Sequence, residues 1–191
     1  MTESLHALLT DAKKLYYEGH HQEALEKYLL ASQQGDLSAQ AFVGQMYFMG
    51  EGTLQNYEEA IKWYTAAAMR DHPPAQSRLA YFYFHVRKDI PKAIEWYQKA
   101  VSNGHMVAMW RLGKIYQHGM GVPADKDKAL RYFEQAAKLG HIFALRQLAV
   151  SLIRGHRGWA QIPLGFRLLA KCIVNGARIA WQSEDDERLR N

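Results

Sequence analysis

Small and apolar residues recur along the chain with a period of 33 to 36 residues. Each copy begins with an alanine, followed by an aliphatic residue four positions later, Gly or Ala five positions later, and usually Tyr eight positions later. In that order the positions are Ala39, Ala75, Ala108 and Ala144; Val43, Leu79, Leu112 and Leu148; Gly44, Ala80, Gly113 and Ala149; and Tyr47, Tyr83, Tyr116 and Leu152. Offsets of four, five and eight residues lie on one helix face, so each copy is predicted to begin with an α-helix.

A second helical pattern follows each of these segments after a loop. Its small and apolar positions recur at offsets of four and seven residues, which also lie on one helix face. They are Ala60, Ala93, Ala129 and Gly165; Tyr64, Tyr97, Phe133 and Leu169; and Ala67, Ala100, Ala136 and Cys172. The loops are "MGEGTLQN", "HVRKDI", "HGMGVPAD" and "RGHRGWAQI". Each copy is therefore predicted to be two antiparallel helices joined by a loop.

Residues typical of helix ends flank the predicted helices. Asn56 with Glu59 matches a capping box, and Asp125 can cap the equivalent helix of the third copy. Pro73 and Pro74 suit a first helical turn. Three glycines fall where a left-handed residue would end a helix, namely Gly104, Gly140 and Gly176.

A single helix pair cannot bury both of its apolar faces, so neighbouring pairs must stack. The predicted fold class is all-α, a right-handed α-solenoid of stacked antiparallel helix pairs. The Gly or Ala beside each aliphatic residue lets the two helices of a pair approach closely, and Gly113 is expected at such a contact.

The repeated pattern resembles a known family. The segment "AMWRLGKIYQHGMGVPADKDKALRYFEQAAKLGH", from Ala108 to His141, is similar to a Sel1-like repeat almost throughout. The copies that start at Ala39 and Ala75 also match, whereas the Ala144 copy is degenerate. The earlier segment "AKKLYYEGHHQEALEKYLLASQQGD" is more similar to a tetratricopeptide repeat, with small or aromatic residues at that motif's spacings. These residues are Gly19, Ala24, Tyr28 and Ala31.

The resemblance implies one solenoid domain over residues 1–191. It divides into a tetratricopeptide-like hairpin (5–35), three Sel1-like repeats (36–72, 73–105 and 106–141), a degenerate fourth repeat (142–176), and a capping helix with a tail (177–191).

Composition and charge narrow the function classes. The chain has 191 residues, 48% of them hydrophobic, and a formal net charge of +5. Its one cysteine, Cys172, suits a reducing compartment, and the first residues have no signal-peptide pattern. We therefore expect a cytoplasmic protein, periplasmic only if a signal has been removed. No apolar stretch is long enough to cross a membrane, and the basic residues form no known nucleic-acid recognition module.

Neither an enzyme nor a metal or cofactor protein is expected from the motifs. His72, His105 and His141 occupy one repeat position, but stacked repeats lie roughly 10 Å apart, too far for one metal ion. The alternative is that these histidines pack and hydrogen-bond at the turns between repeats. Cys172 takes a position that other copies fill with alanine, so it is expected to be a small packing residue. We predict no catalytic residues.

The first helix of each copy offers the best candidate binding surface. In solenoids of this kind the first helices line the concave face, and offsets of two, six, nine and ten residues are expected to face the groove. Together with two tyrosines of the first hairpin, the candidate groove residues are Tyr16, Tyr17, Phe48, Met49, Tyr81, Phe84, His85, Trp110, Lys114, Gln117, His118 and Arg146. Aromatic anchors with charged neighbours suit peptide binding. Alternatively, some of the aromatic residues only extend the core.

The main hypothesis is a non-catalytic protein–protein interaction adaptor or scaffold that holds an acidic-hydrophobic peptide or protein segment. One alternative is an inhibitor or immunity-type protein for a folded partner, because small Sel1-like proteins are often bacterial and sometimes accompany a cognate effector. Another is a self-assembling structural element.

The end of the chain affects the expected oligomeric state. We expect either a monomer or a dimer that forms through the C-terminal repeat. That repeat offers an apolar face with Phe166, Leu168, Leu169, Ile173 and Val174. We expect the tail, through Ile179 and Trp181, to cover this face, with its "EDDE" run partly neutralising the nearby arginines. Self-association through the same face is the rival interpretation.

Overall fold

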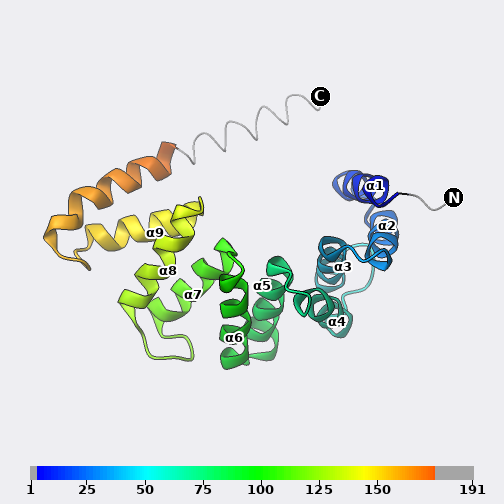
Figure 1. Cartoon of the computed structure of the whole chain (residues 1–191), viewed down its shortest axis with the longest axis horizontal. Helices are drawn as coiled ribbons and strands as arrows, with labels where there is room; N and C mark the ends of the chain where they lie inside the picture. The colour runs from blue at the N-terminus through cyan, green and yellow to red at the C-terminus, as the bar shows by residue number, and fades with distance from the viewer. Residues whose placement is uncertain (1–3, 175–191) are drawn as a thin grey trace. The chain divides into compact units, whose positions relative to one another are not determined.

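The computed structural model describes residues 4–174 (Figure 1). Helices joined by short connections make up this part of the chain, and no strand occurs within residues 4–174. The predicted all-α class is thus confirmed. The chain divides into two compact units, Met1–His105 and Met106–Asn191.

The first unit is a row of helix pairs. Its helices are α1 (Leu5–Tyr17), α2 (His21–Gln33), α3 (Leu37–Met49), α4 (Tyr57–Ala68), α5 (Pro73–Phe82) and α6 (Ile90–Ser102). The pairs are α1 with α2, α3 with α4, and α5 with α6, and the contacts of α2 with α3 and of α4 with α5 join them in chain order. Each pair thus covers the apolar face that its neighbour cannot bury alone.

The second unit continues the same pattern. Helices α7 (Met106–His118), α8 (Lys126–Lys138) and α9 (Ile142–Ile153) pack in sequence, α7 on α8 and α8 on α9. After the 3₁₀ turn η2 (Trp159–Gln161), a helix covers residues 162–174. This helix packs on α9, and the Cys172 Sγ donates a hydrogen bond to the Ile142 carbonyl of α9 at 3.3 Å.

Small residues set the spacing within each pair. A Cβ added to Gly113 on α7 would lie 2.4 Å from the Phe133 ring on α8, and one on Gly44 of α3 would lie 2.8 Å from the Tyr64 ring on α4. Phe133 is fully buried. No real Cβ fits at such distances, so these helices pack as closely as they do only because the glycines have no side chain.

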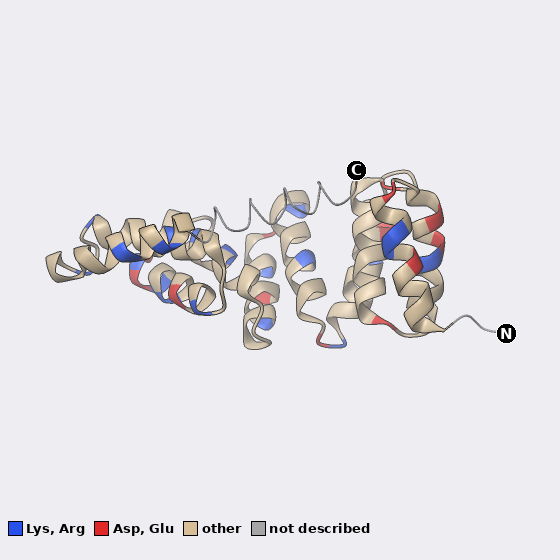
Figure 2. Ribbon diagram, turned by 90° about the horizontal axis from the view of Figure 1, so that it is seen from above, with Lys and Arg blue, Asp and Glu red and all other residues tan. Residues whose placement is uncertain are grey.

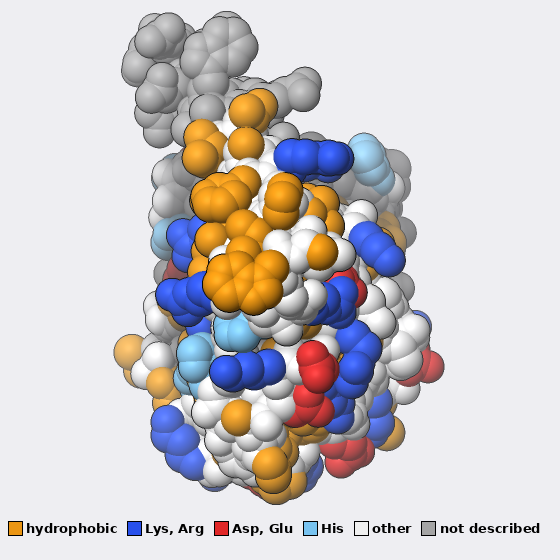
Figure 3. All heavy atoms as spheres, turned by 90° about the vertical axis from the view of Figure 1, so that its left-hand side faces the viewer, with side chains coloured by type: hydrophobic (Ala, Val, Ile, Leu, Met, Phe, Trp, Pro, Cys, Tyr) orange, Lys and Arg blue, Asp and Glu red, His pale blue; other side chains and the backbone are white. Residues whose placement is uncertain are grey.

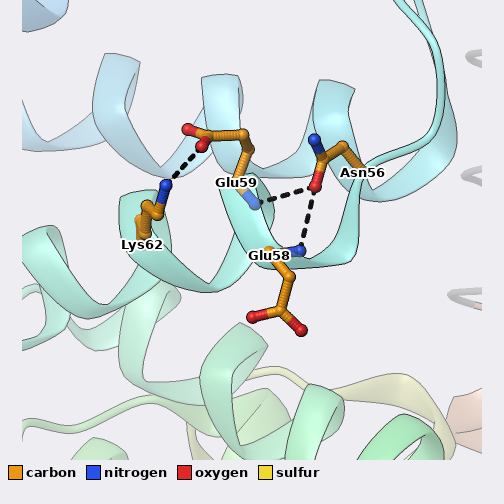
Figure 4. A network of polar contacts seen from close by, with 4 residues as sticks. All are labelled: Asn56, Glu58, Glu59 and Lys62. Carbon is orange, nitrogen blue, oxygen red and sulfur yellow. Dashed lines mark hydrogen bonds and ion pairs between the residues drawn. The ribbon is translucent and has the colours of Figure 1, made fainter.

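The cap of α4 shows how the second helix of a pair begins (Figure 4). The Asn56 side-chain oxygen accepts hydrogen bonds from the backbone N–H groups of Glu58 and Glu59, both at 3.1 Å. The Glu59 carboxylate, however, binds Lys62, and the Asn56 N–H donates to the Tyr47 carbonyl at 2.8 Å. Only half of the predicted capping box therefore forms, because the tyrosine carbonyl already satisfies the donor that Glu59 would have taken.

The same backbone bond recurs in the next two repeats. The Asp89 N–H donates to the Tyr83 carbonyl at 2.9 Å, and the Asp125 N–H donates to the Tyr116 carbonyl at 2.8 Å. Asp125 also caps α8 as predicted, accepting from the Lys128 N–H at 2.8 Å. In all three repeats a backbone hydrogen bond therefore joins the last residue of the connection to the repeat tyrosine, although the connections differ in length.

The second connection differs from the predicted loop over residues 85–90. A π-helical turn, η1 (Tyr83–Arg87), continues directly from α5 and ends at Lys88, whose φ is 56°. Asp89 follows Tyr83 by six positions, whereas the equivalent capping residues follow Tyr47 and Tyr116 by nine. This shorter segment has no room for a free loop, and the wide π turn leads directly to Asp89.

Left-handed residues end the second helices, as predicted for Gly104 and Gly140, with φ of 76° and 91°. In the first copy the non-glycine Asp71 takes the equivalent place with φ of 57°. Gly176 lies outside the described residues.

Gly113→Leu is predicted to destabilise the protein by about 1–3 kcal/mol, because it overpacks the contact with Phe133. The gain in helix propensity on replacing a helical glycine, about 0.5–1 kcal/mol, is too small to offset this cost. Urea unfolding followed by circular dichroism measures the difference. Ala66→Leu, on the exposed side of α4, is the control and should unfold like the parent; a Gly113→Leu midpoint equal to the parent's would show that the helix contact is misassigned.

Candidate functional site

In the first unit the predicted groove residues lie on three helices and the π turn. Tyr16 and Tyr17 are on α1, Phe48 and Met49 are on α3, Tyr81 is on α5, and Phe84 and His85 are in η1. Tyr17, Met49 and His85 are exposed, and the other four are half-buried.

Ring contacts connect four of these residues into one row. Phe48 meets Tyr81 with 6.1 Å between ring centroids, Tyr81 meets His85 at 4.1 Å, and His85 meets Phe84 at 4.8 Å. The row therefore joins α3, α5 and η1, and each ring restricts the rotation of the next. Because all four are only partly covered, the row is an ordered aromatic surface.

Tyr16 belongs to a different group of rings. It packs on Phe42 with centroids 5.0 Å apart, and its hydroxyl donates a hydrogen bond to Glu51 Oε2 at 2.9 Å. Burial, and next the bond to Glu51, raise the pKa of Tyr16. This tyrosine ties α1 to the connection after α3, so a structural role accounts for its hydroxyl.

Arg78 on α5 is a charged residue of this surface that the pattern analysis missed. It is half-buried and hydrogen-bonds to Tyr64, and its positive charge acts on Tyr16 and His72. Burial nevertheless raises the pKa of Tyr64 to about 12. The sequence did contain a signal for Arg78: it lies three residues after Ala75, as Arg111 lies three residues after Ala108. The prediction of groove residues used offsets of two, six, nine and ten and therefore missed both arginines.

In the second unit Trp110 is the centre of a compact aromatic and basic group. Its ring stacks on His141 at 5.4 Å and contacts Phe143 at 6.2 Å, and the Arg111 guanidinium lies 4.8 Å from the indole centroid. Phe143 is 60% exposed. We call Trp110, Arg111, His141 and Phe143 the Trp110 platform; Arg111 and Phe143 were not among the predicted site residues.

The cap of α9 fixes the histidine of this platform. His141 Nδ1 accepts a hydrogen bond from the Ala144 N–H at 3.1 Å, and His72 Nδ1 accepts in the same way from the Ala75 N–H at 3.4 Å. Burial, and then the charge of Arg111, lower the pKa of His141. Both histidines therefore act as neutral helix caps, in line with the hydrogen-bonding role expected at these turns.

The remaining predicted residues of the second unit are polar or basic and lie on α7 and α9. Lys114 Nζ lies 3.1 Å from His118 Nε2, and the Gln117 side-chain oxygen accepts from Gln147 Nε2 at 2.9 Å. Arg146 is exposed on α9, three residues after Phe143. Residues 141–174 contain no Asp or Glu, and only Lys and Arg colours mark α9 and the following helix in Figure 2.

A small cavity lies in the second unit. This cavity lies between α7, α8 and α9, is lined by Gln117, Phe133 and His156 among others, and has a volume of about 30 Å³, enough to hold water. No group of three or more His, Cys, Asp or Glu side chains in the described part could hold a metal ion. None of the described helices is long and apolar enough to cross a membrane.

Comparison with known proteins identifies the family to which these repeats are similar. A family model described as Sel1 repeat matches residues 37–72, 73–105 and 107–141, together more than half of the chain. No curated protein matches the sequence.

Solved structures of Sel1 repeat proteins are also similar to this chain. A Sel1 repeat protein from Oxalobacter formigenes superposes with a TM-score of 0.76 at 26% identity, covering 88% of this chain and 73% of that one. A protective antigen of uropathogenic Escherichia coli strains with an SLR fold gives 0.69 at 26% identity; the match covers 88% of this chain but 38% of the antigen. A Sel1 repeat protein from Klebsiella pneumoniae gives 0.60 at 22% identity, with 95% and 92% covered.

Acidification is predicted to destabilise the protein through its histidine caps. A lowered pKa in the folded state means that the unfolded chain binds the proton more tightly. The stability that these two histidines contribute is therefore fully present above the unfolded pKa of about 6.5 and is lost as the pH drops through the folded value. Denaturant midpoints at pH 7.5 and pH 5 measure the loss.

His141→Asn keeps a cap acceptor that cannot titrate, so the loss between the two pH values should shrink. Gln135→Asn, an exposed change on α8 that involves no titratable group, is the control and should leave the pH dependence as in the parent. An unchanged pH dependence in His141→Asn would contradict the role of the cap.

Proposed function

Because the chain belongs to the Sel1 repeat family, we propose that it is a non-catalytic adaptor that binds a peptide or protein segment on its first helices. Sel1 repeat proteins generally mediate protein–protein interactions. In this chain the partner binds at the Trp110 platform, and the partner segment is acidic and hydrophobic.

The observation that carries the proposal is the Trp110 platform. Trp and Arg are the residues most often found at binding hot spots, where a rigid side chain is buried against the partner. Trp110 already contacts both His141 and Arg111, so it loses little conformational freedom on binding. Phe143 beside it leaves a large apolar surface for a partner side chain to cover.

The charges around the platform define the partner's chemistry. Arg111 contacts the Trp110 ring, Lys114 follows Trp110 by about one helical turn, and Arg146 follows Phe143 by three residues. No Asp or Glu occurs from residue 141 to residue 174. A segment with an apolar side chain for the rings and carboxylates for the cations would gain both contacts, whereas a basic segment would be repelled. The partner segment is therefore acidic and hydrophobic.

The first unit offers a second contact area of related composition. The row of Phe48, Tyr81, His85 and Phe84 is ordered by its own ring contacts and has the exposed Met49 next to Phe48 in the chain. Arg78 supplies a positive charge on the same helix as Tyr81. Aromatic rings with an adjustable methionine suit an apolar segment of a partner.

The titratable side chains support binding over catalysis. His72 and His141 use their Nδ1 atoms to cap helices. Burial raises the pKa of the Cys172 thiol, which keeps it protonated and a poor nucleophile. Sel1 repeats are typically non-enzymatic scaffolds.

Trp110→Ala combined with Arg146→Glu is predicted to weaken binding of acidic-hydrophobic peptides about 30-fold or more, because loss of a hot-spot side chain costs about 2 kcal/mol or more. The probes are two displayed peptide libraries, one rich in Asp, Glu, Leu and Phe, and its counterpart with Lys and Arg for the acids. Selected peptides are then titrated by calorimetry.

The matched control is Trp159→Ala combined with Arg131→Glu, the same exchanges at exposed positions outside the platform. It should bind like the parent, and both variants should keep the parent's helical circular dichroism. Equal enrichment of the basic library, or equal loss in both variants, would refute the platform as the binding site.

A further inference from the structure

The helix over residues 162–174 has a second apolar face that no described residue covers. Phe166 is 58% exposed, Ile173 is 67% exposed, and Val174 is similarly open. Trp159, just before this helix, is 87% exposed. Figure 3 shows hydrophobic side chains gathered in one patch at this end of the second unit, with Lys and Arg on both sides.

The spacing of these residues separates the two faces. Gly165 and Cys172, seven residues apart, are buried against α9. Phe166, Ala170 and Ile173 follow at intervals of four and three residues on another side, and all three are exposed. A surface helix of a globular protein normally has one apolar stripe, so a helix with two is built to be covered on both sides.

The charges beside this face restrict what can cover it. Arg167 and Lys171 are exposed on the same helix, and Arg154 is exposed at the end of α9. Arg157 is already paired with Glu134 through two hydrogen bonds. A second copy of the chain, docked face to face, would bring like charges together. A cover that is apolar in one part and acidic in another would instead neutralise them.

The repeat register points to a segment of this chain that has that composition. After Gly140 the chain enters α9, which packs on α8, and the residues four and five positions later, Ala144 and Leu145, are buried. Counting from Gly176 in the same way gives Ala180 and Trp181. These residues lie outside the described part of the chain.

The correspondence ends after one helical turn. The residues eight and nine positions after Gly140 are Leu148 and Ala149, both buried. The equivalent positions after Gly176 are Glu184 and Asp185, the start of the acidic run. The segment thus begins like another repeat helix and continues with charges, as the polar end of a repeat stack requires.

We propose that residues 177–187 dock on the exposed face of the helix over residues 162–174 and close the stack. Ala180 and Trp181 cover Phe166 and Ile173, and the acidic run meets Arg167 and Lys171. This inference is independent of the proposed peptide-binding function, because it uses neither the Trp110 platform nor the first unit.

Hydrogen–deuterium exchange of the full chain, resolved by mass spectrometry, tests the docking. The reference is a synthetic peptide of residues 175–191. In the parent, amides of residues 177–187 should exchange at least about tenfold more slowly than in the free peptide. In Phe166→Ser combined with Ile173→Ser they should exchange at the free-peptide rate, and Arg167→Glu combined with Lys171→Glu should give an intermediate rate.

Leu54→Ser combined with Met69→Ser is the matched control, since both residues are large, apolar and exposed in the first unit. It should keep the parent's protection. Free-peptide exchange in the parent overturns the proposal. So does protection that disappears on dilution together with a dimer seen by light scattering, because the cover would then be a second copy.

Discussion

The close contact between a glycine on one helix and a large side chain on the next sets the spacing of two helix pairs, α3 with α4 and α7 with α8. Gly113 meets the Phe133 ring, and Gly44 meets the Tyr64 ring, at distances that exclude any side chain on the glycine. In the degenerate copy Leu169 replaces the ring, Ala149 takes the place of the first-helix glycine, and the glycine of the contact, Gly165, lies on the second helix. A Cβ on Gly165 would lie 2.9 Å from the Ala149 carbonyl and from the Ile153 backbone nitrogen. Close approach is thus kept although the residues that permit it change.

The sequence was sufficient for the fold because the core depends on periodic spacing. Helical offsets identified the buried alanines and aromatic residues, and glycine and capping residues marked most helix ends. The π turn η1 and the missing half of the Asn56 capping box were not predictable in this way. Both depend on the tyrosine carbonyl that accepts the backbone bond of the connection, and a backbone acceptor leaves no trace in the residue pattern.

The candidate surface was less predictable than the core for a related reason. Whether a half-buried position faces solvent depends on the neighbouring helix, so a fixed set of offsets included Gln117, which binds Gln147, and omitted Arg78 and Arg111. Phe143 precedes the first alanine of its repeat, where the offsets did not reach. Its value is apparent only once its contacts with Trp110 and His141 are known.

The sequence left open whether the aromatic residues of the first helices bind a partner or only pack, and the observed contacts make the two roles compatible. The Trp110 ring contacts His141 and Arg111, and the Tyr81 ring contacts Phe48 and His85. Such packing fixes the ring orientation without burying the ring completely. A freely rotating aromatic side chain would lose conformational entropy on binding, and a fully buried one could not be reached. Half-burial between helices therefore makes a ring a good anchor, and the stacking of the repeats that forms the core also prepares the surface for a partner.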